Sequence, residues 1–218
     1  MVFAALFLLV QPLPDLTEKQ SFICPPERHE VASARLQKLR DADQDDRRGA
    51  IDASLTERDN ARREEVAALF AEGCLITGRD HHNAALIFQH GKVPEHYYQA
   101  YRWAQRAVAL GDTDAEWLIS RAIDRFLLNS GYKQLFGSNA FSTAPRVGDG
   151  FGPPTPWCLE PVVKEFTDAQ REAQGFPTLQ ERIDRIAQMN ESDGREVGEP
   201  FCDKDLADPP KGVFPGIW

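Results

Sequence analysis

The chain has 218 residues, enough for one domain with a buried core, and its 42% hydrophobic and 27% charged residues are typical of a soluble folded protein. Its formal net charge of -9 argues against a nucleic-acid-binding surface, because phosphate binding needs clustered lysine and arginine. The basic residues are instead mixed with acidic ones, as at 57–65, a pattern that indicates a solvated helix face.

The first 26 residues are an apolar stretch followed by a proline-containing lead-in. No charged side chain occurs in residues 1–14, and Val2 to Val10 are apolar throughout. The stretch is too short to cross a bilayer, so we do not expect an integral membrane protein, but it has the length of the hydrophobic region of a secretory signal. No lysine or arginine precedes it, and no small-residue cleavage motif follows it. One interpretation is a signal peptide on an exported or periplasmic protein. The other is a buried helix or strand in a cytoplasmic protein.

The cysteine count is even, as expected for two disulfides in an oxidising compartment. Cys24, Cys158 and Cys202 lie in proline-rich or loop-like surroundings, where a covalent cross-link stabilises a chain with little regular structure. Cys74 ends a helical pattern and is a candidate buried free thiol. No pair has CxxC spacing, so we do not expect a zinc site, and the pairing cannot be assigned from the sequence.

Two helices are expected before residue 74. The first runs from about Glu27 to Arg40, and residues 41–48 behind it are so densely charged that we expect solvent on most sides. The second begins at Ser54, which has capping-box spacing to Glu57. Its first half is almost wholly charged, so only its second half is expected to be buried. The apolar residues of the two helices are Val31, Ala34, Leu36 and Leu39, then Val66, Ala67, Phe70 and Ala71.

The next helix, at 80–90, should lie inside the protein. Residues 84–88 are apolar, and a helix without a polar face belongs in the core. It ends in Gln89 and His90, so a glutamine and a histidine are carried to the rim of the core. Gly91 is the expected C′ residue.

Two further helices are each expected to have a core-facing stripe. One spans 94–111, and the other spans 113–131 and begins with a capping box formed by Thr113 and Glu116. Arg125 lies at the edge of the second stripe, where an arginine usually has a carboxylate partner. The stripes are Tyr97, Ala100, Tyr101, Ala104 and Val108, then Ala115, Leu118, Ile119, Ala122 and Phe126.

The rest of the chain is less regular. Gly131 to Asn139 is a polar, aromatic, glycine-containing loop, and 141–158 is rich in glycine and proline and has no periodicity. Two short helices are expected from the capping boxes at 167–170 and 178–181.

No segment alternates like a half-buried strand, so the sequence predicts an all-α fold of about six to eight helices. We place this compact helical domain at 27–189, between the lead-in and an irregular, turn-rich tail at 190–218. Residues expected to hold the tail on the surface are Cys202, Phe214 and Trp218.

Two resemblances bear on this fold. Residues 100–115 are similar to a single unit of a Sel1-type helical repeat, and one unit indicates a helical hairpin rather than an array. Residues 41–186 resemble a bacterial family of unknown function. The family motifs appear in order as Asp43-Gln44-x-x-Arg47, Gln89-His90, Asp124-Arg125, the glycine loop at 131–139 and Asp168-x-x-Arg171. This chain departs from the family at three places. Phe136 replaces a tyrosine, and Ser138-Asn139 replaces Thr-Gln. Asp59 and Asn60 are adjacent, whereas the family has an Asp-x-x-Asn spacing on this helix.

The polar residues of these motifs form the candidate site. A histidine at the end of an apolar helix is partly desolvated and neutral, and a neighbouring carboxylate would orient it as a general base. We therefore expect His90 and Asp124 to be the catalytic pair. We expect Arg125 to hold an anionic group, and Gln89 or Gln134 to polarise a carbonyl. The other ligand-binding candidates are Tyr132, Asp43, Gln44 and Arg47.

Neither an activated nucleophile nor a metal site is indicated. The chain has no Gly-x-Ser-x-Gly, and His81, His82 and His90 lack the spacing of metal ligands. No cofactor is indicated either. One hypothesis is a ligand-binding domain, or a hydrolase or transferase, for a small anionic or carbonyl-bearing molecule.

The alternative is an exported helical protein–protein interaction module. Such a module would use a surface formed by Tyr97, Tyr101 and Trp103 together with the long loop. The polar cluster would then be purely structural, because ion pairs commonly join helices and histidines commonly cap helix ends. The sequence thus leaves an unknown small molecule or a protein as the partner.

Overall fold

The computed structural model describes residues 24–48, 54–144, 146–147 and 150–218. The all-α prediction is confirmed, because seven α-helices carry most of the secondary structure within these ranges. They are α2 (Pro26–Asp45), α3 (Leu55–Ala71), α4 (Gly78–Phe88), α5 (Pro94–Ala109), α6 (Glu116–Asn129), α7 (Asp168–Glu172) and α8 (Leu179–Ser192), with a 3₁₀ turn η1 (Thr113–Ala115) before α6. No helix of the described ranges combines the length and the apolar character needed to cross a membrane.

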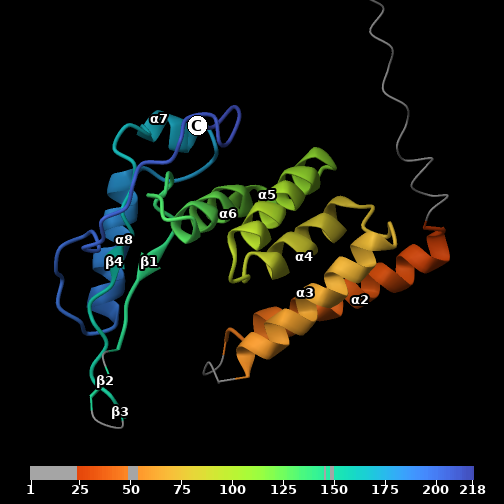
Figure 1. The fold of residues 1–218 in the computed structure, drawn as a ribbon, viewed down its shortest axis with the longest axis horizontal. Helices are drawn as coiled ribbons and strands as arrows, with labels where there is room; N and C mark the ends of the chain where they lie inside the picture. Colours follow the sequence, from red (N-terminus) through yellow and green to blue (C-terminus); the bar gives the residue numbers. More distant parts are fainter. Residues whose placement is uncertain (1–23, 49–53, 145, 148–149) are drawn as a thin grey trace, which may run out of the picture.

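Two short antiparallel ribbons complete the fold. β1 (Ala140–Phe141) pairs with β4 (Cys158–Leu159), and β2 (Arg146–Val147) pairs with β3 (Gly150–Phe151). Figure 1 shows α2 and α3 side by side at one end, α4, α5 and α6 in the middle, and α8 with the ribbons at the other end. The main core lies among α4, α5 and α6 and includes Phe136, Phe166 and Phe214 from the second half of the chain.

Helix α4 is inside the protein, as its composition predicts. All of its residues except Arg79 are buried. The sequence also contains a capping box that we did not predict, in which Thr77 accepts a hydrogen bond from the Asp80 amide and the Asp80 carboxylate accepts one from the Thr77 amide. Gly91 is not in the left-handed conformation expected of a C′ glycine. It is required by close packing, since an added Cβ would come 2.2 Å from the Cβ of His96.

The predicted faces of α2 and α3 are only partly correct, since Leu36 and Val66 are buried as expected and other members of the two stripes are not. Val31 is 72% exposed and Ala34 is also exposed, because the buried stripe of α2 consists of Ala32, Leu36 and Asp43. In the charged segment 41–48 only Asp43 is buried, so most of this segment contacts solvent as expected. In α3 the second half is largely exposed, with Phe70 at 51%, and the buried residues Asp59, Arg62 and Arg63 belong to the charged half. These charged side chains are buried because they pair with one another and with α2, as described below.

The two helices of the middle layer differ in how well their faces were predicted. In α5 the expected stripe is buried except for Val108, and Trp103 is buried with it. In α6 the buried face is rotated towards Ile123, Asp124 and Leu127, so that Phe126 is only partly buried. The capping boxes predicted at Ser54 and Thr113 do not form, whereas those at Thr167 and Thr178 do.

Two disulfides join neighbouring segments of the chain. Cys24 pairs with Cys74, so the candidate free thiol is not free, and this bond connects the start of α2 to the end of α3. Cys158 pairs with Cys202 and fixes the tail to β4. The tail is further held by Phe214, which is fully buried against Tyr101.

Candidate functional site

The first element of the site is the histidine that follows α4. Nδ1 of His90 lies 3.0 Å from Oδ2 and 3.2 Å from Oδ1 of Asp43, a fully buried carboxylate of α2. Nε2 of Gln44 donates to the same carboxylate at 2.8 Å, and Nη1 of Arg47 lies 3.0 Å from it. The Asp-Gln-x-x-Arg motif therefore reaches His90 through Asp43, whose carboxylate both Gln44 and Arg47 contact. The sequence led us to expect Asp124 beside His90. The carboxylate that contacts the imidazole is instead Asp43.

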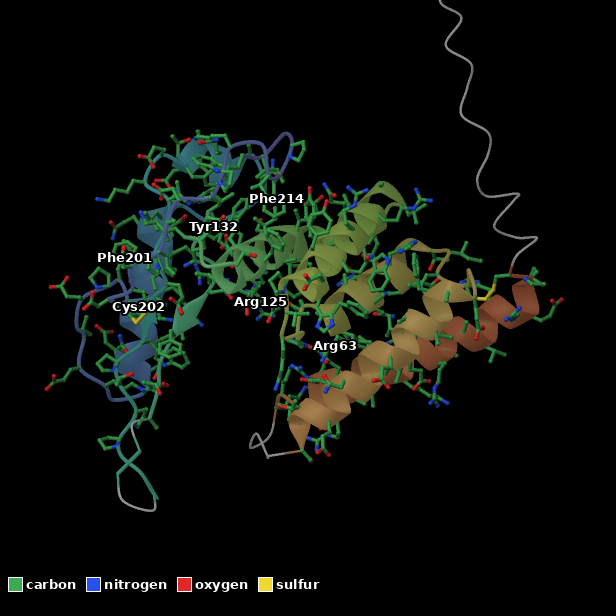
Figure 2. The ribbon with its side chains drawn as sticks, in the orientation of Figure 1. Arg63, Arg125, Tyr132, Phe201, Cys202 and Phe214 are labelled. Carbon is green, nitrogen blue, oxygen red and sulfur yellow. A yellow bond between two sulfur atoms is a disulfide. The ribbon has the colours of Figure 1, made fainter. Side chains whose placement is uncertain are left out.

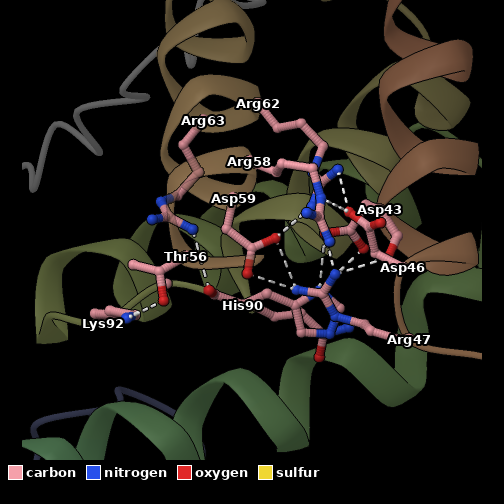
Figure 3. Close-up of polar contacts among 12 residues, drawn as sticks. Asp43, Asp46, Arg47, Thr56, Arg58, Asp59, Arg62, Arg63, His90 and Lys92 are labelled. Carbon is pink, nitrogen blue, oxygen red and sulfur yellow. Dashed lines mark hydrogen bonds and ion pairs between the residues drawn. The ribbon is translucent and has the colours of Figure 1, made fainter. Parts of the chain in front are cut away.

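A network of ion pairs surrounds Asp43 and connects α2 to α3. Nη2 of Arg62 lies 2.7 Å from Asp59 and Nη1 lies 2.7 Å from Asp46, while Nη2 of Arg47 lies 3.0 Å from both carboxylate oxygens of Asp59. Nε of Arg58 lies 2.8 Å from Asp46 at the edge of the network. Figure 3 shows these contacts, in which every carboxylate has at least one arginine partner. The charged half of α3 is buried by this pairing.

Two arginines bind the carbonyl groups at the end of α4. Figure 2 labels Arg63 on α3 and Arg125 on α6. Nη1 of Arg63 donates to the His90 carbonyl at 3.0 Å, and Nη1 of Arg125 donates to the Gln89 carbonyl at 2.5 Å. Arg125 also contacts the side-chain oxygens of Gln89 and Asn139, at 3.2 and 3.4 Å. Positive groups suit the negative end of the helix dipole. The expected carboxylate partner of Arg125 is not found among the described residues.

The electrostatic environment keeps His90 neutral. Burial lowers the pKa of His90, and nearby Arg47 and Arg125 lower it further, whereas the hydrogen bond to Asp43 opposes the change. A neutral imidazole that donates from Nδ1 to Asp43 has its lone pair on Nε2. In the described part of the chain Nε2 has no hydrogen-bond partner, and the side chain is 16% exposed. This is the arrangement that a general base needs.

Asp124 has a different role from the predicted one. Its Oδ1 accepts hydrogen bonds from the amides of Leu135 and Phe136 at 2.8 and 3.0 Å, and its Oδ2 accepts one from the Ser138 amide at 2.9 Å. The carboxylate is fully buried. Burial raises its pKa, and the three amide donors oppose that rise. Asp124 therefore holds the loop at 131–139 in place and does not face His90.

Gln134 serves the same loop. It is fully buried, its Nε2 donates to the carbonyls of Asn139 and Glu160 at 3.1 and 2.8 Å, and its Oε1 accepts from the Asn139 amide at 3.0 Å. Tyr132 is partly buried and forms a β-bridge with Ala207 of the tail. Neither side chain is in hydrogen-bond contact with His90.

The last predicted motif is also structural. Arg171 is 2% exposed, donates from Nη1 to Asp168 at 2.9 Å, and donates from Nη2 to the Leu135 carbonyl at 2.9 Å. Asp168 also accepts a hydrogen bond from the Leu179 amide at the start of α8. The pair thus joins α7 to the loop and to α8, away from His90.

A cavity of about 330 Å³ lies beside Arg125. Its walls come from the end of α6, from β1, and from Glu160 and the 204–206 segment of the tail. Nζ of Lys204 lies 2.6 Å from Oε1 of Glu160 and 4.2 Å from the centre of the Phe141 ring. Nη2 of Arg125 has no hydrogen-bond partner within the ranges that the structure describes. The cavity lining is Arg125, Leu128, Asn129, Asn139, Ala140, Phe141, Glu160, Lys204 and Leu206.

The sequence interpretation missed two groups of residues. The first group is Asp59, Arg62 and Arg63, which lie on the same face of α3 as Val66. Their spacing is that of a buried helix face, but it is recognised as one only if charged residues are counted as buried. Glu160 and Lys204 are brought together by the disulfide next to them, and no local pattern indicates that contact. Within the described ranges, histidine, cysteine and acidic side chains form no group that could hold a metal ion.

Comparisons with protein-family models, with curated proteins and with solved structures found no match to this chain.

Proposed function

We propose that the protein binds a small anionic ligand in the cavity beside Arg125. The observation that carries the proposal is that this arginine contacts only uncharged oxygens, while it lines a cavity of about 330 Å³. Burial lowers the pKa of Arg125, and no carboxylate hydrogen-bonded to it offsets that effect among the described residues. A ligand carboxylate or phosphate would supply the missing counter-charge, and guanidinium groups bind such anions in bidentate geometry.

The remaining walls indicate the shape of such a ligand. Leu128, Phe141 and Leu206 offer apolar surface, and the side chains of Asn129 and Asn139 offer amide groups. A small molecule with one anionic end and an apolar body is the class that fits this lining.

A more specific form of the proposal is a hydrolase or transferase with His90 as the base. Arg125 binds the carbonyl of Gln89, the residue before His90, and its charge acts on the imidazole. The pair of His90 and Asp43 supports proton abstraction from water or from a hydroxyl group. The alternative, a protein–protein interaction module, has less support, because the aromatic part of its expected surface is buried: Tyr97, Tyr101 and Trp103 are 7%, 3% and 4% exposed.

The proposed location is an oxidising compartment outside the cytoplasm. The two disulfides support this proposal, because such bonds persist in exported proteins and are rare in the cytosol. The apolar stretch at residues 2–10, the other basis for expecting export, lies outside the described residues.

The proposal is tested by calorimetric titration with succinate, benzoate and inorganic phosphate. Wild-type protein should bind at least one of these anions, and Arg125→Met should not. Arg63→Met is the matched control, since it also removes a guanidinium from a carbonyl at the end of α4 but does not line the cavity. Equal binding by both variants, or no binding of any anion by the wild type, would contradict the proposal. His90→Gln should keep the binding and lose any turnover.

A further inference from the structure

An ion pair forms part of the wall of the cavity beside Arg125. Nζ of Lys204 lies 2.6 Å from Oε1 of Glu160, and both residues line the cavity together with Arg125. Glu160 is 7% exposed, whereas the Lys204 side chain is 40% exposed. Within the described ranges, the lining thus contains one arginine without a carboxylate partner and one carboxylate with a lysine partner.

The fold holds both members of this pair in place. The amide of Glu160 donates to the Asn139 carbonyl at 3.1 Å, and the Glu160 carbonyl accepts from Nε2 of Gln134 at 2.8 Å. The Lys204 ammonium lies 4.2 Å from the centre of the Phe141 ring. Groups that are positioned before a ligand arrives reduce the entropy that binding costs.

The second carboxylate oxygen of Glu160 lacks a hydrogen-bond donor. Oε2 is buried and has no hydrogen-bond partner among the residues that the structure describes. Because a buried acceptor without a partner is costly, a donor group on a ligand is favoured at this position. The last side-chain torsion of a glutamate is soft, so the carboxylate can turn Oε2 towards the cavity while Oε1 stays with Lys204.

The charges of the lining decide which donor fits there. Lys204 already neutralises Glu160, so an ammonium group of a ligand would be repelled by the Lys204 ammonium beside it. A second carboxylate of a ligand would be repelled by Glu160. The three charged residues of the lining together carry one positive charge, which a single ligand carboxylate balances. A hydroxyl group is the donor that adds no charge.

We infer that the ligand of this cavity is a hydroxy monocarboxylate, whose carboxylate pairs with Arg125 and whose hydroxyl donates to Glu160. The inference rests on the proposed binding of an anion at Arg125, and it makes Glu160 and Lys204 the residues that determine specificity. Amino acids and dicarboxylates are the two related classes that this site disfavours. The carbon skeleton of the ligand packs against the apolar part of the lining, which includes Leu128 and Leu206.

The experiment is calorimetric titration of the full chain, at neutral pH, with compounds that share a benzene ring and one carboxylate. They are benzoate, meta-hydroxybenzoate, para-hydroxybenzoate, para-aminomethylbenzoate and terephthalate. At least one hydroxybenzoate should bind about ten-fold more tightly than benzoate, which corresponds to one hydrogen bond to a charged group. The aminomethyl compound and terephthalate should bind more weakly than that hydroxybenzoate.

Lys204→Met tests the role of charge in this specificity. It leaves the Glu160 carboxylate without its lysine, so para-aminomethylbenzoate should become the tightest ligand of the series. A gain in affinity cannot result from a damaged fold. Lys133→Met is the matched control, because Lys133 pairs with Asp208 at 3.0 Å and does not line the cavity. This variant should keep the wild-type order of affinities.

The outcomes separate this inference from the proposed function. Suppose that benzoate binds and that Arg125→Met abolishes the binding. The inference alone is then overturned if neither hydroxybenzoate is preferred, if the aminomethyl compound or terephthalate is the tightest wild-type ligand, or if Lys204→Met keeps the wild-type order. Failure of the wild type to bind any of these compounds would contradict the proposed function as well.

Discussion

Asp124 is the residue on which the loop at 131–139 depends. Its carboxylate accepts three backbone hydrogen bonds in a site without solvent. Asp124→Ala would leave three buried amides without an acceptor, and each such loss costs about 1–3 kcal/mol. We therefore expect the free energy of unfolding to fall by about 3 kcal/mol or more, measured by urea denaturation.

Asp124→Asn is the control for this prediction. It keeps one oxygen for Leu135 and Phe136 and loses only the acceptor for Ser138. Its cost should therefore be clearly smaller than that of Asp124→Ala. Two variants of equal stability would show that the loop does not rely on these bonds.

His81 provides a test of pH dependence at a single buried residue. Burial lowers its pKa to about 4, and its Nδ1 has no hydrogen-bond partner. The unfolded chain, with a histidine pKa near ~6.5, therefore binds a proton that the folded chain does not bind between these values. The stabilising contribution is fully present above pH ~6.5 and is lost as the pH falls towards 4, up to about 3 kcal/mol.

His81→Leu removes this titration. Its unfolding free energy should change less between pH 6.5 and 4 than that of the wild type, with thermal or urea unfolding at each pH as the measurement. The neighbouring Asp80 does not produce the same window, because its hydrogen bonds with His29 and Thr77 outweigh burial and lower its pKa, so its contribution is lost only at more acidic pH. Parallel pH curves for the two proteins would contradict the assignment.

Single residues were predicted with mixed success, for a physical reason. The position of His90 at the rim of the core follows from the composition of α4 alone. The identity of its carboxylate partner does not follow from the sequence, since only the packing of α2 against α4 brings Asp43, and not Asp124 of α6, to the imidazole. The sequence interpretation gave Asp124 the wrong partner. Its partners are backbone amides of a loop, and a pattern of side chains does not indicate such contacts.

At the scale of elements, the ion network between α2 and α3 should contribute more to the free energy of unfolding than an exposed ion pair does. Although burial acts to raise the pKa of Asp59, hydrogen bonds from Arg62 and Arg47 hold it below its usual value. Asp59→Asn leaves both arginines short of a counter-charge, and breaking such a buried pair costs about 3 kcal/mol or more. We expect the unfolding free energy to fall by this amount at neutral pH. The size of the loss should be only slightly smaller at high salt, because salt screens buried pairs weakly.

The matched control, Asp45, lies on α2, the helix that the network joins to α3. Asp45 pairs with Arg48 at 3.0 Å, but both side chains are mostly exposed, at 67% and 75%. Asp45→Asn should therefore cost less than about 0.5 kcal/mol. A similar loss of unfolding free energy in Asp59→Asn and Asp45→Asn would mean that burial does not increase the contribution of these ion pairs to stability.

Elements were predictable where apolar residues decide burial. The existence of the helices, the buried position of α4 and the caps of α7 and α8 follow from local patterns. The faces of α2 and α3 do not, because pairing between Asp43, Asp59 and Arg62 lets charged residues occupy positions that hydrophobicity assigns to apolar ones. The ligand cavity was not predictable either, since its walls come from segments up to 81 positions apart, from Arg125 to Leu206.

At the scale of the molecule, each disulfide closes its own part of the chain. Removing Cys24–Cys74 by serine substitution should lower the unfolding free energy by about 2–4 kcal/mol and should loosen α2 and α3 first. Hydrogen exchange would report faster exchange in α2 and α3, with α6 and α8 little changed. Uniform acceleration over the whole chain would show instead that the two ends unfold as one unit.

The pairing also follows the order of synthesis. Cys24 binds Cys74 and Cys158 binds Cys202, so each cysteine takes the next one along the chain as its partner. When a chain enters an oxidising compartment from its N-terminus, the first pair can close before Cys158 has emerged, and the correct bonds are those that simple sequential oxidation produces. The protein should therefore acquire its disulfides without the reshuffling that interleaved pairs require, and its yield in an oxidising host compartment should not depend on a disulfide isomerase.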